Sequence, residues 1–342
     1  MKKLHRLLYI LPLVLSLHGC VFDDQSHCPA EIAGDSGLIL SLSYNNGSGE
    51  EEAGVLPLER ADFYIFDARK RFVCSVTDQD GPFTAGHEYR VALPEGSYTV
   101  VSWANLHGKL VISPDPFTAG QTTLDEARVR LAGITLPEKA DTKTATDNLY
   151  ELVRTGGVDK YLYYGTEQSV RVHTGQTTRA VIGLKRNTKV IRLSVRYRHD
   201  DGTPCDDPSH HPDAFIRAAD GIFKFDNSLS PCRAFLLEST QRDDDITGGF
   251  DAAFHKMTLR LNEPVEPEII LTAPDTPSEI VYKESLMKWL KGTGYDSQEK
   301  LDGTHEYLVE LRFTCPHGGG DTHTTLRIFV NGWEYVPMHD DL

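Results

Sequence analysis

Apolar and polar residues alternate along most of this chain in short segments, a pattern typical of β-strands. Residues 38–44, 61–67 and 97–103 show it clearly, and Gly, Pro, Asn or Asp residues separate such segments. Side chains two positions apart lie on the same face of a strand, so each segment can bury one face. The pattern predicts further strands over residues 71–76, 89–93, 169–173, 178–184, 190–197, 215–225, 234–239, 256–261, 268–273, 307–313 and 324–330.

Local signals predict one hairpin and two short helices. Residues 89–93 and 97–103 are joined by Pro94-Glu95-Gly96, a short loop with glycine that is typical of a hairpin. Apolar residues share one helical face over residues 147–154 and again over residues 284–291. Longer amphipathic helices are missing from the pattern, which argues against a parallel α/β fold.

Short strands with frequent turns, and few helices, predict an all-β protein built from two tandem β-sandwich domains with small helical insertions. Polar residues at Lys185-Arg186-Asn187 separate two apolar strands and mark the boundary between them. We expect an N-terminal sandwich over residues 36–186 and a C-terminal sandwich over residues 187–342.

The N-terminus has the layout of a bacterial lipoprotein signal. A basic head precedes the apolar residues 7–17, and Leu17-His18-Gly19-Cys20 then places a small residue before a cysteine. We expect cleavage after residue 19, lipidation of Cys20 and a linker over residues 20–35. The alternative is an ordinary secretory signal with a cysteine there by coincidence. A lipid anchor predicts a location on the outer membrane, and the acidic pair Asp23-Asp24 favours exposure at the cell surface.

Charge excludes one class of partner. The whole chain has 35 basic and 50 acidic side chains, and three of the basic ones lie in the signal segment. The mature chain therefore keeps 32 basic residues against 50 acidic ones. Such a surface repels phosphate backbones, so we expect no nucleic-acid partner.

Lipidation of Cys20 leaves five of the six cysteines, an odd number for an oxidising compartment. With Cys20 lipidated, Cys28 and Cys74 form a plausible disulfide that staples the linker to the first domain. Two of the cysteines Cys205, Cys232 and Cys315 are candidates for a second bridge. Sequence alone leaves the connectivity open, and buried thiols remain the alternative.

Several clusters contain metal-ligand residue types, but none has a strong spacing. The candidates are Cys205 with His210 and His211, and Cys315 with His317 and His323. Zinc sites need three or four converging ligands, commonly in paired motifs that are missing here. Asp243-Asp244-Asp245 suggests calcium but lacks the loop pattern, so a solvated acidic turn is the better interpretation. We predict no metal, no cofactor and no enzymatic activity, because catalytic motifs are also missing.

Two tryptophans lie in strand-like segments, where aromatic residues usually belong to the core. Trp103 and Trp333 are both predicted to be buried. Asn331-Gly332 reads as a tight turn, after which Trp333 starts a short final strand. If Trp333 instead lies exposed at an edge, it is placed to meet a partner.

Several local sequences, in order along the chain, resemble the fimbrillin-associated anchor family of type V fimbriae from anaerobic Gram-negative bacteria. They are Cys28-Pro29 after the lipid cysteine, residues 61–67 ending in Asp67, residues 94–105 with Trp103-Ala104-Asn105, Leu162-Tyr163-Tyr164-Gly165, Leu184-Lys185-Arg186-Asn187, and Phe329-Val330-Asn331-Gly332-Trp333-Glu334. Together they span nearly the whole mature chain.

This resemblance implies transthyretin-like sandwich domains and a lipid-anchored position at the base of a fimbria. It also implies pairing with a fimbrillin subunit by β-strand complementation, in which an extended strand of one subunit completes the sheet of the other. An anchor of this kind is placed to nucleate the fibre or to limit its length.

Three other functions stay open at this point. An accessory or tip adhesin of the same fimbrial system shares the motifs. A surface glycan-binding lipoprotein requires an exposed aromatic cluster on one sheet face. A lipid-anchored hydrolase requires convergent acidic or histidine side chains in a cleft.

Overall fold

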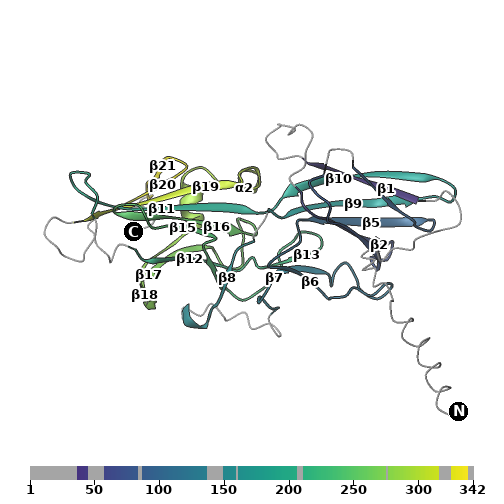
Figure 1. Ribbon diagram of the computed structural model, residues 1–342, viewed down its shortest axis with the longest axis horizontal. Coiled ribbons are helices and arrows are strands. Elements are labelled where there is room, and N and C mark those ends of the chain that lie inside the picture. Colours follow the sequence, from purple (N-terminus) through teal and green to yellow (C-terminus); the bar gives the residue numbers. More distant parts are fainter. Residues whose placement is uncertain are drawn as a thin grey trace, which may run out of the picture.

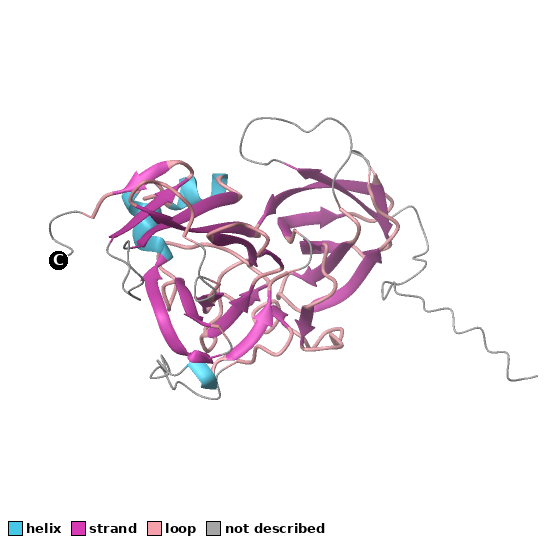
Figure 2. Ribbon diagram, turned by 60° about the vertical axis from the view of Figure 1, so that its left-hand side comes forward, coloured by secondary structure: helices cyan, strands magenta, loops and turns pink. Residues whose placement is uncertain are grey.

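The computed structural model describes residues 37–44, 58–83, 87–136, 149–158, 161–205, 211–274, 276–315 and 325–337. These residues form a nearly all-β molecule in which sheets of seven, six, five and three strands are arranged in two lobes (Figure 1). The helices are small and lie at the periphery (Figure 2). The predicted fold class, β-sandwiches in tandem with small helical insertions, is confirmed. In the part of the chain that the structure describes, no helix is long and apolar enough to span a membrane.

The first lobe is a single sheet that folds over on itself. Its strand order is β3 (Phe72–Asp78), β2 (Ala61–Asp67), β5 (Gly96–Ala104), β9 (Tyr163–Val172), β10 (Thr177–Arg186), β1 (Gly37–Tyr44) and β4 (Glu88–Val91). β2 and β4 lie near opposite ends of this order, yet the rings of Phe63 and Tyr89 are 4.5 Å apart. The sheet therefore closes into a sandwich around its own apolar face.

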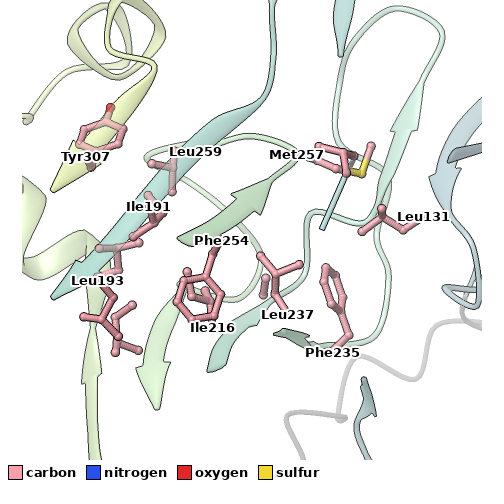
Figure 3. Close-up of a cluster of buried hydrophobic side chains, with 14 of the residues drawn as sticks. Leu131, Ile191, Leu193, Ile216, Phe235, Leu237, Phe254, Met257, Leu259 and Tyr307 are labelled. Carbon is pink, nitrogen blue, oxygen red and sulfur yellow. The ribbon is translucent and has the colours of Figure 1, made fainter. Parts of the chain in front are cut away.

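The second lobe packs two sheets face to face. One contains β15 (Gln241–Asp243), β16 (Gly249–Lys256), β11 (Lys189–His199), β19 (Glu306–Cys315), β20 (Thr325–Val330) and β21 (Trp333–Tyr335). The other contains β18 (Thr276–Ser285), β17 (Glu268–Ala273), β12 (Asp213–Ala218), β14 (Phe235–Glu238) and β8 (Val153–Gly156). Between them, Ile191 and Leu193 of β11 lie in one cluster with Ile216 and Leu237 (Figure 3). The helices α1 (Leu286–Gly292) and α2 (Gln298–Gly303) precede β19.

A small fourth sheet, with three strands, joins the lobes. It consists of β6 (Leu110–Ser113), β7 (Arg128–Leu131) and β13 (Ile222–Lys224). The rings of Trp103 and Phe223 are 6.0 Å apart, and those of Tyr64 and Phe225 are 5.0 Å apart. β2 and β5 are consequently covered on both faces, which explains why residues 61–66 are all buried.

Strand pairing crosses the predicted boundary at residues 186 and 187. β8 from the first half of the chain pairs with β14, and β7 pairs with β13 from the second half. The large core cluster likewise contains residues of both halves, among them Leu131 and Met257 (Figure 3). The division into residues 36–186 and 187–342 stays a prediction, and the two lobes share strands and core across it.

The predicted hairpin between residues 89–93 and 97–103 is wrong. β4 pairs with β1, whereas β5 pairs with β2 and β9. The segment 92–95 instead carries the chain from one part of the curled sheet to another, and the Tyr98 hydroxyl donates to the Pro94 carbonyl at 2.9 Å. Alternation shows that a segment is a strand but not which strand it pairs with.

Two other local predictions are wrong and one is confirmed. The helix expected over residues 147–154 is a single 3₁₀ turn, Leu149–Glu151, followed by β8, because pairing with β14 outweighs local propensity. The strand expected over residues 256–261 is irregular, since β16 has already ended at Lys256. The helix expected over residues 284–291 is confirmed as α1, and the Ser285 side chain caps it.

Candidate partner-binding surface

The C-terminal hairpin β20–β21 ends the six-stranded sheet. Its turn consists of Asn331 and Gly332, whose φ angles of 48° and 83° are left-handed. Such a two-residue turn matches the twist of a hairpin. The Asn331 side chain accepts a hydrogen bond from Leu308 N at 2.8 Å and donates one to Tyr295 Oη at 2.6 Å. The turn is therefore fastened both to β19 and to the segment that follows α1.

Large apolar side chains are exposed at this edge. Trp333 is 72% exposed and Val336 is 71% exposed. β21 is the terminal strand in the sheet order, so its outer side has no paired strand among the described residues. Natural proteins usually protect such edges with charge or covering loops. An edge that presents tryptophan and valine instead has the properties of an interaction site.

β21 is itself held firmly in place. Tyr335 is buried, and it lies so close to Gly292 of α1 that a Cβ there would be 2.4 Å from its ring. Arg312 of β19 and Arg327 of β20 stack over the ring of Phe329 in β20, at 4.2 and 5.2 Å from its centroid. The exposed tryptophan thus extends from a fixed strand, which lowers the entropic cost of binding.

A charged rim lies next to the apolar edge. The Arg327 guanidinium donates two hydrogen bonds of 2.6 Å to Glu334, and this contact lowers the pKa of the Glu334 carboxyl. Arg312 forms a similar two-bond pair with Glu310. Exposed pairs like these add little stability. These pairs form a polar rim beside the apolar edge, and an apolar patch with a polar rim is the usual arrangement of an interface.

Apart from this edge, the molecule has a groove where the two lobes meet. This groove of about 750 Å³ is lined by β9, β10, the loop at residues 225–229 and the segment 260–262. Its walls combine charged groups such as Lys185, Asp226 and Arg260 with the mostly covered rings of Tyr164 and Phe225. It lacks the exposed aromatic cluster on one sheet face that glycan binding requires.

The burial predictions for the two tryptophans have different outcomes. Trp103 is fully buried, as expected, whereas Trp333 is exposed, so its predicted burial is wrong. Next to Trp103, Asn105 has a left-handed φ of 62°. Its side chain accepts from Glu59 N at 2.9 Å and donates to Tyr161 O at 3.0 Å. Asn105 thus ties three segments of the first lobe together.

The other motif residues in the described chain also have structural roles. Asp67 accepts hydrogen bonds from the backbone of Arg69 and Arg71 and so shapes the β2–β3 turn. Gly165 is required by close packing, since a Cβ there would lie 2.7 Å from Ile182. Asn187 exchanges two amide hydrogen bonds with Asn227 at the junction of the lobes. These motifs maintain the fold.

The predicted cysteine roles are only partly within the described residues. Cys20 and Cys28 lie outside them, so lipidation and the Cys28–Cys74 pairing stay predictions. Cys74 is buried and disulfide-bonded. Cys205, Cys232 and Cys315 form no disulfide, so a second bridge among them is wrong and the alternative of thiols holds.

The metal candidates do not converge where they can be seen. His210, His317 and His323 lie outside the described residues, and within them no group of three or more metal-ligating side chains comes together. Asp244 is engaged by Arg242 and lies near His211, and the Arg242 hydrogen bond lowers its pKa. Within this acidic turn, Asp244 is thus paired with a neighbouring arginine.

The structure defines an all-β protein of tandem sandwiches whose C-terminal sheet edge exposes apolar side chains. A family model described as "Fimbrillin-A associated anchor proteins Mfa1 and Mfa2" matches residues 25–337. The chain belongs to this family, as its motifs indicated.

Solved structures share the fold. The fimbrial anchor protein Mfa2 from Porphyromonas gingivalis is 16% identical, with a TM-score of 0.66 over 87% of this chain and 98% of that one. A candidate polysaccharide-binding protein from Bacteroides thetaiotaomicron is 19% identical, with a TM-score of 0.68 over 90% and 99%. A candidate adhesin from Bacteroides ovatus is 17% identical, with a TM-score of 0.67 over 89% and 95%. A comparison with curated proteins gave no match.

One residue of the surface was not predicted from the sequence. Val336 follows β21 and has no periodic pattern that could have marked it.

Proposed function

We propose that this protein is a non-enzymatic outer-membrane lipoprotein that anchors a fimbria at its base by pairing with a strand of a fimbrillin subunit. The observation that carries the proposal is the family match over residues 25–337, which begins shortly after Cys20, the cysteine of the predicted lipoprotein signal. A lipidated subunit is tethered where the fibre begins, which favours a base position over a tip position.

The open side of β21 is the proposed pairing site. A strand added by the partner forms hydrogen bonds with the unpaired backbone groups of β21. The side chains of that added strand cover Trp333 and Val336. Main-chain hydrogen bonds then provide register, and the tryptophan provides most of the apolar contact. The partner donates the strand, because β21 is already fixed by Tyr335 and by the Arg327–Glu334 pair.

The arrangement of the lobes supports this assignment. β1, the first strand after the predicted linker, lies in the right-hand lobe of Figure 1, whereas β21 lies in the left-hand lobe. A lipid at Cys20 would hold the first lobe toward the membrane. The edge that meets the fimbrillin would then face away from it.

The test is affinity capture of the protein from solubilised outer membranes, followed by identification of co-purifying subunits. Wild type should retain a fimbrillin subunit, and Trp333→Ala combined with Val336→Ser should reduce recovery at least about tenfold, since a buried interface tryptophan commonly contributes 2 kcal/mol or more. Val181→Ser is the matched control, because Val181 is 57% exposed on the first lobe. Equal fimbrillin recovery from wild type and the double variant would reject the β21 site.

A separate variant tests the anchor. Cys20→Ala should release the protein from membranes. The released protein, captured from the fraction without membranes, should still retain a fimbrillin subunit. If this variant stays in the outer-membrane fraction, lipidation is wrong even where the pairing site is right.

One rival has a specific observation in its favour. The Bacteroides thetaiotaomicron structure with the same fold is described as a candidate polysaccharide-binding protein. In this chain Trp333 is the single aromatic among the large apolar side chains that the described residues expose. Glycan arrays that bind the wild type, together with captures that contain no fimbrillin, would favour that function. Immunolabelling along the fibre or at its tip would instead favour an accessory adhesin.

A further inference from the structure

A lysine and two carboxylates are buried together in the second lobe. Lys256 is the last residue of β16, Asp220 lies between β12 and β13, and Glu263 lies in the loop after β16. The side chains of Lys256 and Glu263 are fully buried, and that of Asp220 is 1% exposed. All three charged groups are therefore withdrawn from solvent, although such burial is costly unless geometry compensates for it.

The lysine nitrogen touches both carboxyl groups. Lys256 Nζ is 2.9 Å from Asp220 Oδ2, and it lies 2.9 and 3.0 Å from the two Glu263 oxygens. Backbone groups fix the acids from behind, since Thr258 N donates to Asp220 at 3.0 Å and Arg260 N donates to Glu263 at 3.0 Å. The Lys256 nitrogen is thus held against the carboxyl group of Asp220, and the carboxyl group of Glu263 lies beside both.

Burial and mutual attraction shift the pKa values of Glu263 and Lys256. Burial raises the pKa of Glu263 to about 7, against the lowering effect of Lys256. Burial alone would lower the pKa of Lys256, but attraction to Asp220 and Glu263 outweighs it and raises the pKa. The resting pair therefore keeps the Lys256 ammonium charged, and the reaction proposed below starts from its minor neutral amine form. Glu263 is suited to carry a proton near neutral pH.

We propose that Lys256 and Asp220 join through an autocatalytic intramolecular isopeptide bond, with Glu263 as the proton carrier. Proton transfer from the Lys256 ammonium to Asp220 gives a neutral amine and a neutral acid. The Nζ lone pair then attacks Cγ of Asp220, and Glu263 takes one proton from Nζ. When the intermediate collapses, the Asp220 hydroxyl leaves with that proton as water, and Glu263 regains its starting state. The products are one amide and one water molecule, and nothing is oxidised or reduced.

Proximity makes this step feasible without an external activator. Groups held in a fixed reactive geometry reach effective concentrations of about 10⁵–10⁸ M. Exclusion of solvent also removes the water that would reverse the reaction. The bond would tie the end of β16 in the six-stranded sheet to the β12–β13 connection, and so cross-link three sheets of the molecule.

A neighbouring lysine provides an internal control. Lys189 pairs with Lys256 across β11 and β16 and is also buried. Its Nζ donates to the backbone carbonyls of Leu301, Asp302 and Thr304. Those carbonyls are amides already, so Lys189 should stay a free amine in the same preparation.

The test is peptide mapping of the full chain by mass spectrometry after trypsin digestion. Trypsin cuts after lysine and arginine but not after an acylated lysine. A cross-linked chain therefore yields residues 218–224 joined to residues 243–260, lighter by one water than the sum of the two peptides. An unreacted chain yields residues 218–224, 243–256 and 257–260 as separate peptides. Recovery of the separate peptides alone from the wild type would overturn the proposal, and cleavage after Lys189 shows that digestion is complete.

Two variants assign the roles. Glu263→Gln removes the proton carrier, so the joined peptide should fall at least about a hundredfold, the low end of general acid–base contributions. Asp220→Asn keeps the electrophilic carbon, so the joined peptide should still form, with ammonia lost in place of water. A Glu263→Gln chain that cross-links as fully as the wild type would remove Glu263 from the mechanism.

Discussion

Two tryptophan–asparagine motifs occur at very different places in this molecule, and their difference separates fold from function. Trp103 precedes Asn105 at the end of β5, and Asn331 precedes Trp333 at the start of β21. Both asparagines have left-handed φ angles, and both join separate segments through side-chain hydrogen bonds. The two asparagines therefore have the same structural role, whereas the two tryptophans have different roles.

The number of covering layers explains the contrast. Trp103 lies on a central strand beneath the three-stranded sheet and is fully buried. Trp333 lies on the last strand of a sheet and is 72% exposed. A covered tryptophan stabilises the fold by its burial, while an uncovered one retains that apolar surface for a partner.

Removing the covered tryptophan should have the largest effect on stability. Trp103→Ala is expected to lower the free energy of unfolding by about 3–5 kcal/mol, because a large cavity opens beside Tyr164 and Phe223. Chemical denaturation of the purified protein measures this. The loss should appear in both lobes at once, since this cluster contains residues of both. A loss below about 1 kcal/mol would contradict the shared core.

The asparagine beside it should come next. Asn105→Ala leaves Glu59 N and Tyr161 O without their side-chain partners and forces alanine into a left-handed φ, so we expect a loss of about 2–4 kcal/mol. Asn105→Gly removes the same hydrogen bonds without the backbone cost. Thermal denaturation should rank wild type above Asn105→Gly, and that variant above Asn105→Ala.

The asparagine at the edge should matter less, because its turn is nearer to solvent. Asn331→Ala is expected to cost about 1–2 kcal/mol, through the lost contacts to Leu308 N and Tyr295 Oη and the strained φ. Hydrogen exchange should show the loss locally, as faster exchange over β20 and β21. Uniform acceleration over the first lobe as well would show that the hairpin belongs to the central core.

Removing the exposed tryptophan should have the smallest effect on stability. Trp333→Ala is expected to change the free energy of unfolding by less than about 0.5 kcal/mol, since little buried surface is lost. Its effect on fimbrillin capture should nevertheless be large. A clear drop in stability would mean that the side chain is packed in solution and unavailable to a partner.

Much of the fold was readable from the chain. Period-two alternation located most strands, including β11, where Ile191, Leu193 and Val195 all enter the core. It failed where a choice between partners mattered. β4 follows the pattern of a hairpin arm, yet it pairs with β1, because curling the sheet buries Tyr89 against Phe63. Pairing depends on which apolar faces meet, and those faces come from distant parts of the chain.

The candidate site was less readable. The Asn331-Gly332 turn followed from residue type alone, because few other pairs accept left-handed φ at both positions. The exposure of Trp333 did not follow, since it depends on β21 being the last strand of its sheet. The buried group of Lys256, Asp220 and Glu263 had no sequence signal, as its members lie in separate loops and strands.

The sequence by itself determined the all-β class, the turn residues and the family, because alternation, left-handed asparagines and motif order are all local properties of the chain. The predicted lipidation of Cys20 rests on the same local evidence. Only the tertiary structure decided which strands are neighbours, which tryptophan is covered and which charges are buried together. Those properties arise when faces from distant segments pack, and solvent exclusion at each residue is set by the layers above it rather than by its own neighbours in the chain.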